Sequence, residues 1–424
     1  RIMALKKKPV TGMRDILPVE MQVREYVMNQ IRDTYRSFGF TQIETPCVEH
    51  IENLTSKQGG DNEKLIFKIL KRGEKLNLET AACENDLVDG GLRYDLTLPL
   101  ARYFSNNGAQ LSMPFKALQM GSVWRADHPQ KGRFRQFTQC DIDILGDESS
   151  MAEIELIMAT TTALGKICPK NGFTVRMNDR EILKAMALYC GFSEDSMESV
   201  FIILDKMDKI GMEGVKAELL EAGHGEESVE KYGTLLSETG RDAAGVRKLG
   251  EILKSVMDLS VTDNLAHIMD TVLNVADTEF NLCFDPTLVR GMSYYTGTIF
   301  EVSMEGFGGS VAGGGRYDKM IGKFTGKDTP ACGFSIGFER IITILMDQGE
   351  CSHKEREKKA YLVEKGMDSA RLGEIMKQAM AERKNGVQVL VSMMNKNKKF
   401  QKEQLGKEGY TEFVNFYKEE LKKN

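Results

Sequence analysis

Hydrophobic and polar residues alternate in helix-like and strand-like stretches along the first third of the chain. Apolar residues such as Met21, Val27 and Ile31 recur at helical spacing over residues 17–38, and Gly39 ends the pattern. A strand is predicted over residues 40–46. Residues 64–71 and 91–103 have the pattern of a strand and of a strand leading into a helix.

Residues 113–146 are the most strand-like part of the sequence. One strand is predicted over 115–125 and a second over 134–145, with a polar turn at 127–132 between them. Ser150 and Glu153 then have the spacing of a capping box that opens a helix. We therefore expect a long antiparallel hairpin followed directly by a helix.

The pattern changes further along the chain and suggests five parts. Helical periodicity dominates residues 175–276, where glycines (Gly191, Gly211, Gly223, Gly240 and Gly250) serve as separators. Strand patterns return at 282–315, and a strand at 331–336 leads into a helix at 338–346. The predicted parts are a core at 1–174, a helical insertion at 175–276, further core at 277–349, a linker at 350–359 and a small α/β module at 360–424.

Composition narrows the class of protein. The 424 residues are 41% hydrophobic and 28% charged, and no run of about 18 apolar residues suggests a membrane span. None of the eight cysteines form a C-x-x-C pair, so we expect reduced thiols in a cytoplasmic protein, without a structural metal. The net charge is −5, but the chain from Lys354 onward contains 17 Lys and Arg against 11 Asp and Glu. A basic segment on an acidic body suits local contact with phosphates, although a lysine-rich surface is more often simply solvated.

The loop of the predicted hairpin concentrates cationic side chains. Arg125, Lys131 and Arg133 could bind phosphates, and Phe134 could stack on a purine. An exposed charged hairpin tip is the alternative interpretation.

Two strand-like stretches could present polar groups to a small substrate. Asp95 and Thr97 are two residues apart, so on a strand they would share a face and could bind an ammonium group. Gln139, Asp141 and Asp143 would share a face of the second hairpin strand, where a carboxylate could accept from an imidazole N–H. A strand end and a solvent-facing strand side are the structural alternatives.

Three later segments add a cation, phenols and glycines. Arg290 precedes the paired Tyr294 and Tyr295, and residues 313–315 are three glycines that permit close backbone approach. Arg340 falls in the first turn of a predicted helix, where the dipole favours anions. Neither a dinucleotide fingerprint nor a G-x-x-x-x-G-K-[ST] loop is present.

In combination and in this order, these segments resemble class II aminoacyl-tRNA synthetases of the histidyl family. Residues 39–46 are similar to motif 1, 115–146 to motif 2 and 333–341 to motif 3, while 289–297 and 313–318 are similar to the two histidine-specific segments. The resemblance implies an α+β fold with an antiparallel sheet flanked by helices. It also implies a homodimer that uses ATP with Mg²⁺ to attach L-histidine to tRNA(His).

The resemblance also implies residue roles. Arg290 and Arg125 would be catalytic at the α-phosphate. The histidine-binding residues would be Asp95, Leu96, Thr97, Gln139, Asp143, Tyr294, Tyr295 and Tyr317. The ATP-binding residues would be Arg125, Asp127, Arg133, Phe134 and Arg340. No protein ligand for a metal can be assigned.

The sequence departs from the family pattern in three places. Asp127 stands where glutamate is more common, Ser293 stands where aspartate is usual, and the tail after Lys359 is short for an anticodon-binding domain. A non-catalytic paralogue that senses histidine as a regulatory subunit is the main alternative. A class II synthetase for another amino acid is a further alternative, which Asp143 and the paired tyrosines disfavour.

Overall fold

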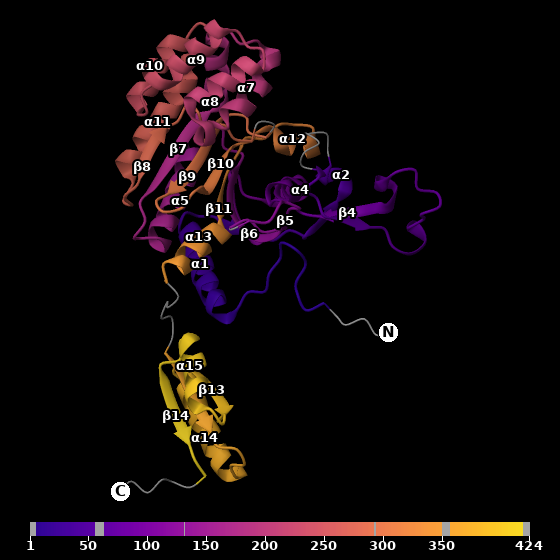
Figure 1. The fold of residues 1–424 in the computed structure, drawn as a ribbon, viewed down its shortest axis with the longest axis vertical. Helices are drawn as coiled ribbons and strands as arrows, with labels where there is room; N and C mark the ends of the chain where they lie inside the picture. The colour runs from indigo at the N-terminus through magenta and orange to yellow at the C-terminus, as the bar shows by residue number, and fades with distance from the viewer. Residues whose placement is uncertain (1–5, 56–62, 131, 292–293, 350–356, 419–424) are drawn as a thin grey trace. The chain divides into compact units, whose positions relative to one another are not determined.

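The computed structural model describes residues 6–55, 63–130, 132–291, 294–349 and 357–418. The chain divides into two compact units, one made of the residues up to Arg14 together with Asn29–Thr343, the other of Asp15–Met28 together with the chain from Ile344 onward. Helices flank a large, mostly antiparallel sheet (Figure 1), so the predicted α+β fold is confirmed.

An eight-stranded sheet forms the centre of the first unit. Its order is β1-β5-β6-β11-β10-β9-β7-β8, and neighbours are antiparallel except at the two ends, β1 with β5 and β7 with β8. The strands are β1 (Thr41–Gln42), β5 (Phe115–Trp124), β6 (Gln136–Leu145), β7 (Phe173–Asp179), β8 (Asn281–Phe284), β9 (Thr298–Met304), β10 (Ser310–Arg316) and β11 (Ala331–Gly337). The hairpin and the later strands therefore become neighbours although about 190 residues separate them in sequence.

Helices pack around this sheet. Those of the first unit include α4 (Thr97–Asn107), α5 (Met151–Ile167) and α12 (Lys319–Thr325), while α1 (Pro18–Ser37) and α13 (Phe338–Asp347) each run from one unit into the other. Helix α5 packs against β6 and β11, and its buried face includes Leu156, Ile157 and Leu164. Burial of large aliphatic side chains of this kind stabilises a fold by about 1.5–3 kcal/mol each.

The hairpin loop is longer than predicted. Strand β6 begins at Gln136 and not at Phe134, because the backbone N–H of Arg135 donates to the carbonyl of Gly12 at 2.8 Å instead of pairing within the hairpin. The predicted strand at 40–46 is reduced to the two residues of β1. Beyond Ile43 the chain leaves β5. The next strand, β2 (Val48–His50), pairs with Gly90–Leu92 in a second, smaller sheet.

The predicted capping box at Ser150 is wrong, although the helix does begin at Met151. Ser150 has helical backbone angles and makes no side-chain cap. The carboxylate of Glu153 instead accepts two hydrogen bonds from Arg316, at 2.6 and 2.7 Å. The N–H of Met151 donates to the hydroxyl of Ser149.

The helical segment begins at Arg180, because residues 175–179 belong to β7. Its helices are α6 (Arg180–Tyr189), α7 (Met197–Leu204), α8 (Met207–Glu221), α9 (Glu226–Glu238), α10 (Ala243–Leu253) and α11 (Leu259–Val275). Asp179, Asp242 and Asp258 accept backbone N–H groups at the starts of α6, α10 and α11.

One predicted glycine separator has a different role. Gly250 lies inside α10, where an added Cβ would come within 2.2 Å of the hydroxyl of Thr262 on α11. Glycine therefore lets these two helices approach closely. Gly211 does interrupt α8, since its φ of 68° is not helical.

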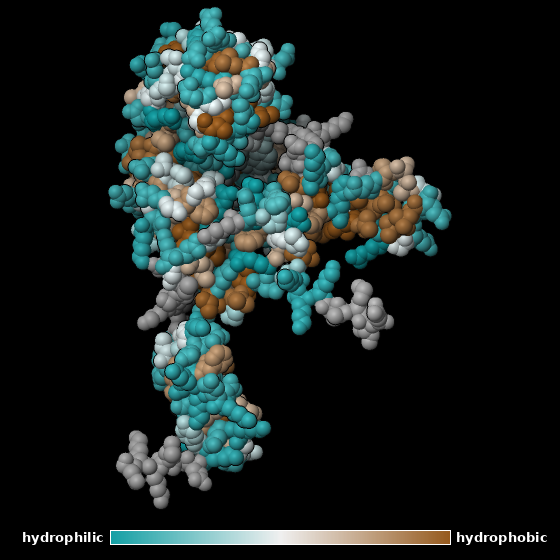
Figure 2. All heavy atoms as spheres, in the orientation of Figure 1, coloured by the Kyte–Doolittle hydropathy of each residue, from teal (hydrophilic) through white to brown (hydrophobic). Residues whose placement is uncertain are grey.

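A second, three-stranded sheet has the order β2-β4-β3, with β4 (Val88–Leu92) in the middle and β3 (Lys68–Leu70) at one edge. The short helix α2 (Ile51–Leu54) packs on β4. Figure 2 shows hydrophobic side chains gathered on the arm that carries this sheet, and Val48, Leu70 and Leu78 of this segment are exposed.

The second unit contains a small α/β sheet near the C-terminus. Strands β13 (Gln388–Met393), β12 (Lys358–Val363) and β14 (Glu412–Phe416) pair in parallel, and α14 (Ser369–Lys384) and α15 (Lys398–Lys407) connect them. Strand β12 starts two residues before the predicted boundary at 360. Residues 350–356 of the predicted linker lie outside the described residues.

Among the helices of the described chain, none combines the length and apolarity needed to cross a membrane.

Candidate active site

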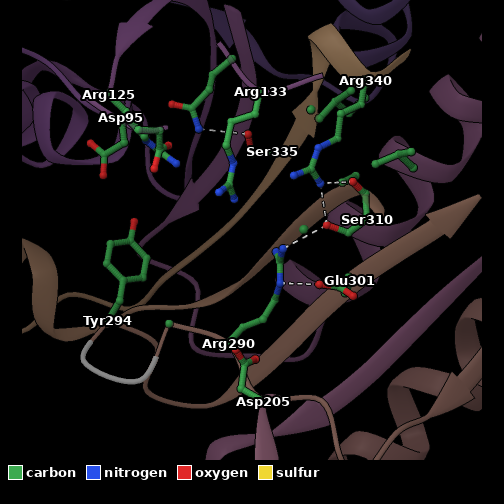
Figure 3. A pocket seen from close by; sticks show the side chains of 18 of the residues that line it. Asp95, Arg125, Arg133, Asp205, Arg290, Tyr294, Glu301, Ser310, Ser335 and Arg340 are labelled. Atoms are coloured by element: carbon green, nitrogen blue, oxygen red, sulfur yellow. Dashed lines mark hydrogen bonds and ion pairs between the residues drawn. The ribbon is translucent and has the colours of Figure 1, made fainter. Parts of the chain in front are cut away.

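A cavity of about 840 Å³ opens beside the central sheet. Its walls come from the hairpin loop, from strands β6, β9, β10 and β11, and from the junction of α7 and α8. Figure 3 shows charged side chains from these separate elements pointing into one space. The eight-stranded order creates this convergence, since it places the hairpin beside β11 and β10.

Most of the candidate residues chosen from the sequence line this cavity. They are Asp95, Thr97, Arg125, Asp127, Arg133, Phe134, Gln139, Arg290, Tyr294, Tyr295 and Arg340. Three candidates do not line it, namely Leu96, Asp143 and Tyr317. Lys131 and Ser293 lie outside the described residues.

Arg290 pairs with a carboxylate on β9 and occupies the space that a glycine leaves on β10. Its Nε donates to Glu301 on β9 at 2.7 Å. A Cβ added at Gly313 on β10 would lie only 1.8 Å from Nη1 of Arg290. Only glycine at position 313 leaves room for the guanidinium this close to the strand.

Arg340 reaches the same place from the start of α13. Its Nη1 donates to both the carbonyl and the hydroxyl of Ser310, the latter at 3.0 Å. Nη2 of Arg290 donates to the same hydroxyl at 3.2 Å. Burial and the nearby cations Arg290 and Arg133 lower the pKa of Arg340, so these like charges face one another across a small space (Figure 3).

Arg125 occupies the opposite wall at the end of β5. Its Nε donates to the carbonyl of Tyr94 at 2.8 Å, and its guanidinium lies 5.3 Å from the ring centroid of Phe137. These contacts fix the side chain while its terminal nitrogens line the cavity.

The purine-stacking candidate Phe134 has a cation on its ring. The guanidinium of Arg14 lies 4.5 Å from the ring centroid and pairs with Glu339 at 3.3 Å. Glu339 also accepts from the backbone N–H of Thr138 at 3.2 Å. The N-terminal segment therefore supports the aromatic ring beside motif 3.

Asp95 and Thr97 face the cavity, but they are not on a strand as predicted. Strand β4 ends at Leu92, and Thr97 is the first residue of α4. Asp95 accepts the N–H of Leu98 at 3.1 Å, as a side chain at a helix start does. Burial raises the pKa of the Asp95 carboxyl.

A row of polar groups on β6 forms the floor of the cavity. Gln139 and Asp141 both line it, and the hydroxyl of Ser335 on the neighbouring β11 donates to Asp141 and accepts from Gln139 at 3.4 Å. Burial, and next the charge of Asp143, raise the pKa of Asp141 well above its usual value.

Asp143 and Tyr317 form a buried pair. The phenol of Tyr317 donates to Oδ1 of Asp143, and neither side chain is more than 3% exposed. Burial raises the pKa of Asp143 to about 7, although the hydrogen bond from Tyr317 opposes this shift. Leu96 is also buried, in the core, and its backbone carbonyl accepts from the side-chain amide of Gln119 and from the backbone N–H of Leu100.

Two buried oxygen atoms near the floor, Oδ2 of Asp143 and Oε1 of Gln139, have no hydrogen-bond partner among the described residues. Unsatisfied buried acceptors are destabilising by about 1–3 kcal/mol each. A ligand with N–H donors would remove this penalty.

The paired tyrosines pack as a perpendicular pair. The ring centroids of Tyr294 and Tyr295 are 4.9 Å apart at 88°, and Tyr294 lies 5.4 Å from Tyr317. Burial raises the pKa of Tyr295 to about 12, so its phenol stays protonated at neutral pH. Both tyrosines line the cavity.

Sequence reasoning assigned no role to Glu301, Ser310 or Ser335, although all three line the cavity. Ser335 lies within the segment similar to motif 3, and Glu301 lies four positions after the first histidine-specific segment. Ser310 lies three positions before the first of the three glycines, and only its hydrogen bonds with Arg290 and Arg340 reveal its importance.

Comparisons with a family model and with known proteins all point to one family. The family model described as histidyl-tRNA synthetase matches residues 12–341. A histidine–tRNA ligase of Leifsonia xyli is 46% identical over 351 residues, which cover 81% of each chain, and one of Christiangramia forsetii is 38% identical over 82% of this chain and 78% of its own.

Solved structures share the fold. A histidyl-tRNA synthetase from Nostoc superposes with a TM-score of 0.78 at 28% identity, covering 96% of this chain and 90% of its own. A protein of Bacillus halodurans, described as an ATP phosphoribosyltransferase regulatory subunit/histidyl-tRNA synthetase, has a TM-score of 0.77 at 21% identity, covering 98% and 99%. This chain belongs to the histidyl-tRNA synthetase family.

Proposed function

We propose that this protein activates L-histidine with ATP to give histidyl-adenylate and pyrophosphate, and then transfers the histidyl group to tRNA(His) with release of AMP. One observation carries the proposal. Arg125, Arg290 and Arg340, from three separate segments, line one cavity whose floor carries buried carboxylates and phenols. Cations suit the polyphosphate, and the buried acceptors suit an amino acid with N–H donors.

The first step is an in-line attack of the histidine carboxylate on the α-phosphorus. The bond to the β-phosphate oxygen breaks, and pyrophosphate leaves with that electron pair. Arg125 and Arg290 would stabilise the negative charge that shifts across the α-phosphate. The carboxylate is already ionised at neutral pH, so no general base is needed, and catalysis rests on positioning and electrostatics.

The nucleotide and amino-acid ends of the cavity differ in chemistry. Asp127 and Phe134 would hold the adenine, and Arg133 and Arg340 the outer phosphates. Asp95, Thr97 and Gln139 would bind the α-ammonium group, while Asp143 and Tyr295 would bind the imidazole between Tyr294 and Tyr317. The unpartnered Oε1 of Gln139 and Oδ2 of Asp143 support this assignment, because histidine supplies N–H donors at both ends.

Magnesium would be bound to the phosphates of ATP and not held by the protein alone. Two carboxylates near the phosphate-binding arginines are engaged, Glu301 by Arg176 and Arg290 and Glu339 by Arg14. The described residues contain no cluster of three or more potential metal-binding side chains. The described residues therefore do not fit a dedicated protein-held metal site.

We also propose a homodimer, a tRNA contact through the C-terminal module and a cytoplasmic location. The exposed apolar surface on the arm of β2, β3 and β4 supports a homodimer, since such patches often mark protein interfaces. The basic C-terminal module would contact the tRNA. The described cysteines are free thiols, as expected for a cytoplasmic enzyme of protein synthesis.

The test is pyrophosphate exchange into ATP, measured separately with each of the twenty amino acids, followed by charging of tRNA(His). Histidine alone is expected to support exchange. Arg290→Ala is expected to reduce exchange by at least about 10²-fold while histidine binding persists, since it removes a transition-state contact. Histidine binding without any exchange would instead favour the regulatory paralogue.

A further inference from the structure

The hydroxyl of Ser310 lies between the two arginines proposed to bind opposite ends of the ATP phosphates. Ser310 is the first residue of β10, Arg340 lies in the first turn of α13, and Arg290 lies in the segment before β9. Figure 3 shows both guanidinium groups directed at this one residue. The hydrogen bonds of 3.2 Å from Arg290 and 3.0 Å from Arg340 bring the two donor nitrogens within 6.2 Å of each other.

This spacing is unfavourable without a shared acceptor. Two guanidinium groups repel each other, and the only carboxylate paired with Arg290 among the described residues, Glu301, also binds Arg176. A serine hydroxyl has two acceptor lone pairs, and here one is offered to each arginine. Its carbonyl also accepts from Arg340.

We propose that Ser310 is a positioning residue that holds Arg290 and Arg340 at the spacing required by the polyphosphate of ATP. This inference rests on the proposed function, in which both arginines bind phosphates. Loss of the hydroxyl removes the acceptor that the two cations share. Only separate contacts then hold them, Arg290 to Glu301 and Arg340 to the carbonyl of Ser310, so the phosphates meet a less preorganised pair of donors. Histidine binding, which uses the β6 floor and the tyrosines, does not depend on this contact.

The central variant is Ser310→Ala, with Ser310→Thr as the conservative replacement. Ser303 lies directly opposite Ser310 on β9 and does not line the cavity, so Ser303→Ala is a matched control. We expect Ser310→Ala to raise the KM for ATP about tenfold or more, on the scale of one lost charge-assisted hydrogen bond. Ser310→Thr should restore the KM to within about threefold, and the Kd for histidine should not change.

A double-variant cycle separates positioning from general damage to the fold. In an Arg340→Ala background, Ser310→Ala should change the KM for ATP by less than about threefold, because one of the two groups that it positions is already absent. An equal effect in both backgrounds would overturn the proposal. So would an unchanged KM for ATP in Ser310→Ala alone, or equal changes in histidine and ATP affinity.

Calorimetric titration with ATP alone keeps this test separate from the proposed activity. If the wild-type protein binds ATP but shows no histidine-dependent exchange, the proposed function fails, and weaker ATP binding by Ser310→Ala still supports the positioning role. If the wild-type protein does not bind ATP, both proposals fail.

Discussion

Substitution of Gly313 by alanine should strongly reduce catalysis without unfolding the protein. The added Cβ would lie 1.8 Å from Nη1 and 2.8 Å from Cζ of Arg290, whereas real Cβ contacts essentially never fall below 3.0 Å. The guanidinium must therefore move by at least 1.2 Å or swing out of the cavity. Misplacement of a catalytic group by about 1 Å can reduce a rate about 10²-fold.

The assay is histidine-dependent pyrophosphate exchange, with thermal unfolding as the measure of stability. We expect kcat to fall about 10²-fold or more. The Tm should change little, because Arg290 is about one-third exposed and can move toward solvent. Gly308→Ala is the matched control, since an added Cβ there meets no atom within 4 Å. Exchange by Gly313→Ala within twofold of wild type would refute the reasoning about Arg290.

Two further predictions concern stability. Burial raises the pKa of Asp143 to about 7 from 3.8. The unfolded chain therefore loses this proton first as pH rises, and the free energy of unfolding falls between about pH 4 and 7, by about 1.4 kcal/mol for each pH unit in that range. Asp143→Asn removes this titration. The Tm of this variant, relative to that of the wild type, should therefore rise as the pH increases over the same range, and a difference in Tm that does not change with pH would contradict the assignment. Glu153→Ala removes a buried carboxylate and leaves Arg316, whose side chain is only 12% exposed, without its bidentate partner, so it should destabilise the protein by about 3–5 kcal/mol, measured by chemical denaturation. Glu155→Ala on the same helix, which removes a more exposed pair with Lys116, should cost about 1 kcal/mol or less, and equal effects would argue against the role of burial.

The sequence predicted local elements more reliably than their ends. Periodicity located the hairpin and the helical segment, because both depend on residues close in sequence. The ends of β6 and of β1 were set by distant partners, the carbonyl of Gly12 and the edge of the small sheet. Such partners cannot be read from a local pattern.

The candidate site shows the same division. Residues recognised by motif, such as Arg290 and Arg340, do line the cavity, although Asp95 and Thr97 do so from a helix start and not from a strand. Glu153 had the spacing of a capping residue, yet it binds Arg316 from 163 positions away. Ser310 could not have been chosen from sequence, because its role depends on two arginines that approach it from other elements.

The geometry of bound ligands tests the central claim most directly. A crystal structure with histidine and a non-hydrolysable ATP analogue should place the α-phosphate within hydrogen-bond distance of Arg125 and Arg290 and the terminal phosphate at Arg340. The imidazole should lie beside Asp143 and Tyr295. A nucleotide bound elsewhere, with these arginines still turned toward Ser310, Glu301 and the carbonyl of Tyr94 alone, would contradict the account.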